Sequence, residues 1–158
     1  MAAGIIRILF TPAPLRPRPW LLWAWVTLLI IVPTFPWSDF VGHSHWDKVR
    51  WIPFADFTFA PMMIVDVLGN FGWFAVFGYL FHYRKEDRSY ASLKPAIATA
   101  FLLSLLLEGF QVFCHNRIPS MTDVTCNVLG AAFGSYLAST HQPTPTPQGH
   151  TLVLEDSD

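Results

Sequence analysis

Four apolar blocks separated by short polar connections constrain what this chain can fold into. They cover residues 20–36, 62–83, 95–114 and 120–138. Each block approaches the ~20 residues that a membrane-spanning helix needs. Hydrophobic residues make up 53% of the chain and charged residues only 13%, which is about half of the ~25% usual in soluble proteins. We therefore predict an all-α polytopic membrane protein, built as a bundle of four transmembrane helices.

The remaining segments predict the domain organisation. Residues 1–19 hold arginines among prolines and are predicted to form a short cytoplasmic arm, followed by one transmembrane domain over residues 20–139. Residues 140–158 combine prolines with acids, without an apolar period, and are predicted to be a disordered tail. Residues 37–60 mix charged groups with Trp and Phe, which favours an interfacial or re-entrant segment between the first two helices.

The first block could also belong to a signal peptide. No small-x-small cleavage site follows it, so a first spanning helix is favoured. The distribution of Lys and Arg then predicts the orientation, because basic residues concentrate on the cytoplasmic side. With four spans and the N-terminus inside, the C-terminus is also inside. The inner side would carry Arg7, Arg16, Arg18, Arg84, Lys85, Arg88 and Lys94, and the outer side Lys48, Arg50 and Arg117.

One short sequence motif occurs twice inside this apolar sequence. The pattern Asp-Val-x-x-Asn stands at residues 66–70 and again at residues 123–127. Residues four apart share one face of a helix, and a carboxylate in a spanning helix costs about 2.5–3.5 kcal/mol on insertion scales. Because the second and fourth helices would run in the same direction, the two halves would form a parallel repeat with a site between them.

Further polar groups fall at the same depth as this repeat. Glu108 and Gln111 share a face near the outer end of the third helix, and Arg117 lies in the next connection. The predicted ligand-binding residues, all in the outer half of the membrane, are Glu108, Gln111, Arg117, Asp123, Asn127, Asp66 and Asn70. The alternative is that Asp and Asn only fix helix packing, at about 0.6 kcal/mol per contact. Packing is favoured for the asparagines and for Gly69, Gly72, Gly130 and Gly134, and function for Glu108, Gln111, Arg117 and Asp123.

The charge balance of this cluster leaves two possibilities. Three carboxylates in an apolar setting cannot all ionise without cations. Arg117 is the first candidate counter-charge and Arg50 the second. Either some acids are protonated or a cationic ligand completes the balance.

Other chemistry is less well supported by the sequence. His43-x-His45-x-Asp47 alternates metal-capable residues, but no third and fourth ligand is evident, so we expect no metal and no cofactor. Cys114 and Cys126 both lie toward the outer face, and a disulfide between them stays open. No hydrolase, zinc-protease or phosphate-loop motif occurs, and no nucleic-acid partner is expected.

The polar residues of the second half form a recognisable order. Glu108-x-x-Gln111 is followed by Arg117-x-x-Ser120-x-x-Asp123 and then by Asn127-x-x-Gly130-x-x-x-Gly134. This order resembles the C-terminal signature of VanZ-like membrane proteins, and Ile52-Pro53-Phe54 with Asp66 and Asn70 resembles the first half of that family. The resemblance covers about residues 50–138.

The resemblance implies a small multi-pass protein of the bacterial cytoplasmic membrane. The founding member of the family is associated with resistance to the glycopeptide teicoplanin. We therefore expect a role in the cell envelope, in which an outward-facing polar cleft binds an amphipathic molecule such as a lipid-linked precursor or a lipoglycopeptide. Membrane lipids are the other expected partners. The alternatives are an intramembrane enzyme with Glu108 and Asp123 as acid and base, and a proton-coupled transporter. The oligomeric state stays open.

Overall fold

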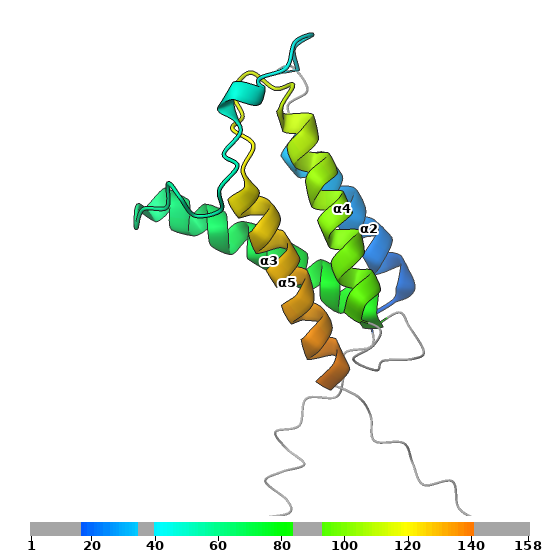
Figure 1. The fold of residues 1–158 in the computed structure, drawn as a ribbon. Coiled ribbons are helices and arrows are strands. Elements are labelled where there is room, and N and C mark those ends of the chain that lie inside the picture. Colours follow the sequence, from blue (N-terminus) through cyan, green and yellow to red (C-terminus); the bar gives the residue numbers. More distant parts are fainter. Residues whose placement is uncertain (1–16, 35–39, 84–92, 141–158) are drawn as a thin grey trace, which may run out of the picture.

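The described part of the chain is helical, as predicted. The computed structural model describes residues 17–34, 40–83 and 93–140; most of the predicted arm and nearly all of the predicted tail lie outside these ranges. Within them there are four α-helices and no strand. The helices are α2 (Pro19–Thr34), α3 (Pro61–Tyr83), α4 (Leu93–Gln111) and α5 (Met121–Thr140), with a 3₁₀ turn η2 (Trp46–Lys48) before α3 (Figure 1).

The four helices differ in whether their length and composition would allow them to span a membrane. Two of the described helices, α3 and α4, are long and apolar enough to cross a bilayer. Helix α2 is apolar but has only 16 residues. Helix α5 has 20 residues but interrupts its apolar sequence with polar side chains. Two possible spans are therefore seen, and four remain a prediction.

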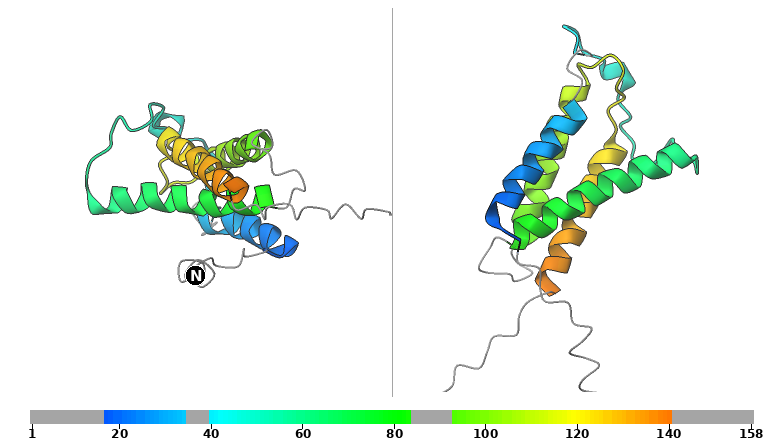
Figure 2. Two further views of the ribbon diagram at one scale, coloured as in Figure 1. Left: turned by 90° about the horizontal axis from the view of Figure 1, so that it is seen from below. Right: turned by 180° about the vertical axis from the view of Figure 1, so that it is seen from behind.

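Helix α3 crosses the molecule obliquely. Its C-terminal half packs among the other helices, whereas its N-terminal half projects away from them (Figures 1 and 2). Its most extensive contact is with α5. At this crossing a Cβ on Gly78 would overlap the backbone of Ala131, and a Cβ on Gly134 would overlap that of Ala75. The two backbones can approach closely only because glycine has no side chain.

The glycines on the other turns of α3 do not serve this purpose. Gly69 and Gly72 have open space where a Cβ would stand. The expectation that they permit close approach is therefore wrong, whereas Gly130 and Gly134 fulfil it. On α3 the close-approach position is Gly78 instead, where the Ser135 hydroxyl donates a 3.0 Å hydrogen bond to the carbonyl oxygen.

Helix α2 is fixed to α3 by aromatic residues. The rings of Trp25 and Trp73 stack with centroids 4.6 Å apart, and the Trp25 indole N–H donates a 2.9 Å hydrogen bond to the Trp73 carbonyl. Around them the buried core combines Leu22, Leu29, Phe74, Phe77, Ala100, Leu107 and Ala131. This core lies between the helices and leaves large apolar side chains exposed on their outer faces, as expected where lipid replaces water.

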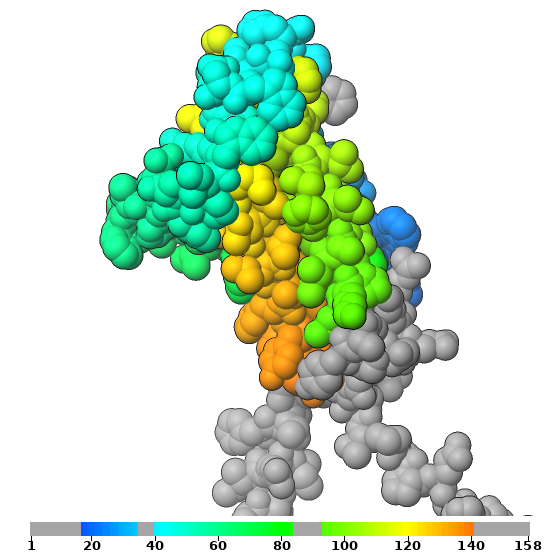
Figure 3. Space-filling view, viewed as in Figure 1, coloured from blue at the N-terminus to red at the C-terminus, as the bar shows by residue number. Residues whose placement is uncertain are grey.

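Residues 40–60 fold over one end of the bundle and contain no helix longer than the 3₁₀ turn η2. They lie against the connection between α4 and α5, and together the two segments form a cap over that end (Figure 3). The Arg50 N–H donates to the Pro119 carbonyl, and the Met121 N–H donates to the Arg50 carbonyl, both at 2.9 Å. These bonds hold the cap directly over the first turn of α5.

Candidate functional site

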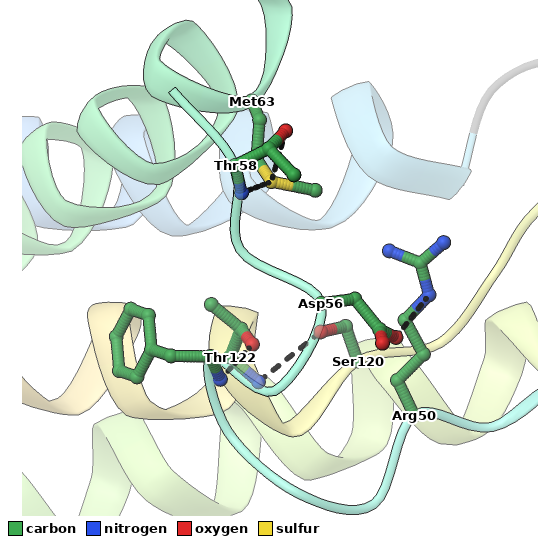
Figure 4. Close-up of polar contacts among 7 residues, drawn as sticks. Arg50, Asp56, Thr58, Met63, Ser120 and Thr122 are labelled. Atoms are coloured by element: carbon green, nitrogen blue, oxygen red, sulfur yellow. Dashed lines mark hydrogen bonds and ion pairs between the residues drawn. The ribbon is translucent and has the colours of Figure 1, made fainter. Parts of the chain in front are cut away.

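The two aspartates of the repeat line one cavity. Asp66 on α3 and Asp123 on α5 face a space of about 170 Å³, which we call the carboxylate cavity. Arg50 and Asp56 of the cap also line it. Figure 4 shows these two cap residues approaching Ser120 and Thr122 at the start of α5. The fold therefore brings the two acids of the repeated motif to one cavity.

The two asparagines of the repeat line a different cavity. Asn70 and Asn127 face a space of about 140 Å³ together with Glu108 and Gln111, closed on one side by apolar side chains of α2. We call this the carboxamide cavity. Because Asp and Asn are four residues apart in each copy, about one helical turn separates the carboxylates from the carboxamides. The Asn70 side chain also interacts with the Asp123 carboxylate, so residues of the two cavities are in contact.

Glu108 joins the end of α4 to the start of α5. Its carboxylate is buried and accepts a 2.8 Å hydrogen bond from the Ser120 backbone N–H. Its other oxygen accepts a 3.4 Å bond from the Gln111 carboxamide. The Ser120 hydroxyl accepts a 3.1 Å bond from the Thr122 N–H, so Ser120 is the N-cap of α5, as its spacing to Asp123 predicted.

Only one of the two polar atoms of the Asn127 side chain has a hydrogen-bond partner among the described residues. Its carboxamide nitrogen donates a 2.8 Å hydrogen bond to the Ser104 hydroxyl on α4, and both residues are buried. Its carboxamide oxygen is buried without a hydrogen-bond partner among the described residues. A buried polar atom in this state is a place where a ligand or water molecule can be stabilised. Ser104 was not predicted, although it precedes Glu108 by four residues and so shares its helix face.

The arginine of the carboxylate cavity is Arg50 rather than Arg117. Arg50 pairs with Asp56 at 3.5 Å, with both side chains substantially exposed. Arg117 is half-buried, lines neither of the two cavities, and acts on Glu108 through its charge. Arg117 was the first choice of counter-charge from the sequence because it stands next to the motif. Arg50 and Asp56 are more distant in the sequence from Asp123, and the pairing of their segment with the connection before α5 brings them to the cavity.

An apolar groove lies next to the carboxylate cavity, at the start of α3. It has a volume of about 410 Å³, and its lining includes Met62, Met63 and Asp66. Met63 and Asp66 also line the carboxylate cavity. The Thr58 N–H contacts the Met63 sulfur at 3.1 Å, which fixes the entry to α3 (Figure 4). The polar cavity and the apolar groove therefore share a wall.

The motif Ile52-Pro53-Phe54 supports this cavity with a strained residue. Phe54 has φ of 60°, which is unusual for a bulky side chain. Its N–H donates a 2.9 Å hydrogen bond to the Thr122 hydroxyl on α5. Strained backbone of this kind persists where surrounding contacts hold it, often at functional sites.

Cys114 and Cys126 are both buried, and no disulfide joins them among the described residues. A disulfide between them therefore plays no part in this site.

Elsewhere in the cap, burial lowers the pKa of His45, and the positive charge of Lys48 lowers it further.

The fold and the two cavities define a small helical membrane protein with a polar site at one end of its bundle. Comparison with protein families gives the particular family. The model of the VanZ/LLP1 family matches residues 20–142, and the chain belongs to this family. No curated protein and no solved structure shows significant similarity to the chain.

Proposed function

We propose that this VanZ/LLP1 protein binds an amphipathic molecule of the bacterial cell envelope. The headgroup would occupy the carboxylate cavity, and an acyl chain would lie in the groove along α3. The observation that carries the proposal is that Met63 and Asp66 line both spaces, which places a polar and an apolar space next to each other. A molecule with a polar head and an apolar tail fits both at once.

The charges of the carboxylate cavity favour an amine-bearing headgroup. Asp56, Asp66 and Asp123 face this space, and among the described residues Arg50 is the only basic one in its lining. A ligand cation would offset the excess of carboxylates. A lipoglycopeptide such as teicoplanin carries an amine and an acyl chain, so glycopeptide resistance is one instance of this binding role. A lipid-linked envelope precursor with an amine is the other.

The arrangement gives less support to an enzyme. Glu108 lines the carboxamide cavity, whereas Asp123 lines the carboxylate cavity. An acid and base acting on one substrate must both reach it. Glu108 is moreover engaged by the Ser120 N–H and the Gln111 side chain.

The proposed topology places the cavities toward the outside of the cytoplasmic membrane. Four spans, with both termini inside, would place the more basic side of the chain in the cytoplasm. The cap over residues 40–60 and the connection between α4 and α5 would then face the cell envelope, where the proposed ligand resides.

Binding of teicoplanin to the full chain in lipid nanodiscs tests the proposal. We expect Asp66→Asn and Asp123→Asn to weaken binding by about tenfold each, as loss of a charge-assisted contact requires. Asp47→Asn, which neutralises an exposed carboxylate of the same cap, is the matched control and should bind as the unmodified protein does. An unacylated glycopeptide should bind more weakly than teicoplanin. Equal binding by all three variants would refute the assignment of these acids.

A further inference from the structure

Three histidines from two segments that are distant in the sequence meet in the cap. His43 and His45 come from the segment before α3, and His115 from the connection between α4 and α5. One ligand atom from each lies within 4.8 Å of the other two. The ring centroids of His43 and His45 are 4.7 Å apart, and those of His45 and His115 are 5.5 Å apart. The third ligand that the sequence did not reveal is therefore supplied by the fold.

Backbone hydrogen bonds hold these histidines together. The His45 N–H donates to the Val112 carbonyl at 2.9 Å, and the Val41 N–H donates to the Phe113 carbonyl at 2.8 Å. A side-chain bond adds to them: the Lys48 ammonium donates a 3.2 Å hydrogen bond to the His115 carbonyl. Two backbone bonds and one side-chain bond thus join the two segments, so the position of the histidine cluster does not depend on side-chain contacts alone.

The ring of His45 carries an independent sign of a ligand. His45 is buried, and its Nε2 has no hydrogen-bond partner among the described residues. Buried side-chain nitrogen atoms in folded proteins nearly always have a partner. His43 and His115, by contrast, are exposed, so their rings can turn toward a shared centre. Zn–N bonds of 2.0–2.1 Å place tetrahedral ligands about 3.3 Å apart, a distance that small rotations of the two exposed rings would reach.

We propose that His43, His45 and His115 bind a divalent transition-metal ion, with Zn²⁺ as the expected ion. Imidazole nitrogen suits Zn²⁺ and its neighbours in the first transition row, whereas Ca²⁺ and Mg²⁺ prefer oxygen. Three protein ligands leave a position for water or another ligand. The ion would join the segment before α3 to the connection between α4 and α5, and so hold the cap in place over the start of α5.

Zinc binding by the purified full chain, carrying no histidine tag, tests this site. We expect one equivalent of Zn²⁺ to remain after dialysis, and titration to show an affinity about tenfold or more lower for His43→Ala and for His115→Ala. Both positions are exposed, so the variants should keep their helical content by circular dichroism. Ser44→Ala, which lies between two of the ligands, is the matched control and should bind as the unmodified protein does.

Two further measurements keep the proposal falsifiable. Excess Mg²⁺ should not displace the ion, and Zn²⁺ should raise the Tm of the unmodified protein and of Ser44→Ala but not of the histidine variants. If His115→Ala loses helical content, His43→Ala and His115→Gln take its place. A protein that retains no Zn²⁺, a site that Mg²⁺ empties, or histidine variants that bind Zn²⁺ with unchanged affinity would each overturn the proposal. None of these results depends on binding of an envelope molecule.

Discussion

The Ser120 N–H donates a 2.8 Å hydrogen bond to the buried Glu108 carboxylate, and this bond joins the last turn of α4 to the start of α5. A backbone amide is a fixed donor, because its position is set by the helix that it begins. The bond therefore holds Glu108 in place at the edge of the carboxamide cavity, and fixes where α5 starts relative to α4.

Removal of this acceptor should destabilise the protein. We expect Glu108→Ala to lower the free energy of unfolding by about 1–3 kcal/mol, the range for removing one partner of a buried hydrogen bond. The measurement is equilibrium unfolding in mixed micelles. Hydrogen exchange at Ser120 should also become faster, because its N–H loses its acceptor. Leu106→Ala, an exposed position on the same helix, is the control and should leave that exchange unchanged. Slow exchange at Ser120 in Glu108→Ala would contradict this role.

The helices were predictable because their apolar blocks are long and contain few charged residues. The predicted blocks 62–83 and 120–138 correspond closely to α3 and α5. The third block was expected to continue to residue 114, but α4 ends at Gln111. The carbonyls of Val112 and Phe113 accept hydrogen bonds from the cap, so tertiary pairing ends the helix where local propensity would continue it.

The sequence indicated most of the residues that line the two cavities, but not which residue lines which cavity. Six of the seven predicted residues line the two cavities; Arg117 lines neither. That the acids and the amides of the repeat occupy separate cavities depends on how α3 crosses α5. That crossing is set by glycine contacts, which no local pattern of α3 distinguishes: Gly78 lies at the contact and Gly72 does not. The approach of Arg50 depends on pairing across about seventy residues of chain, which spacing along the sequence does not encode.

The close crossing of α3 and α5 should be sensitive to a single methyl group. We expect Gly134→Ala to lower the free energy of unfolding by about 1–3 kcal/mol, because the new Cβ would overlap the Ala75 carbonyl and force the backbones apart. Unfolding in mixed micelles measures this. Gly72→Ala is the matched control: it adds the same methyl group where nothing lies within 4 Å, and should not destabilise. Equal stability of the two variants would show that the helices do not pack through this glycine.

The buried bond between Asn127 and Ser104 should show a measurable coupling. Comparable contacts within membranes average about 0.6 kcal/mol and reach about 1.7 kcal/mol. We expect a double-mutant cycle with Asn127→Ala and Ser104→Ala to fall in this range. Thr125→Ala provides the control cycle with Ser104→Ala, because the Thr125 hydroxyl bonds to the Met121 carbonyl within its own helix. Coupling indistinguishable from that control would mean that the bond at 2.8 Å adds nothing to stability.

The ion pair between Arg50 and Asp56 should contribute little to stability, in contrast to Glu108. Its atoms are 3.5 Å apart, and its side chains are 42% and 64% exposed. Exposed pairs of this kind contribute about 0.2–1 kcal/mol, because water and salt screen the attraction. We therefore expect Asp56→Asn to change the free energy of unfolding by less than about 1 kcal/mol, and added salt to reduce that small effect further. Since Asp56 also lines the carboxylate cavity, the same substitution should weaken teicoplanin binding while folding is preserved. A large loss of stability that salt does not diminish would show that Asp56 supports the fold rather than the ligand.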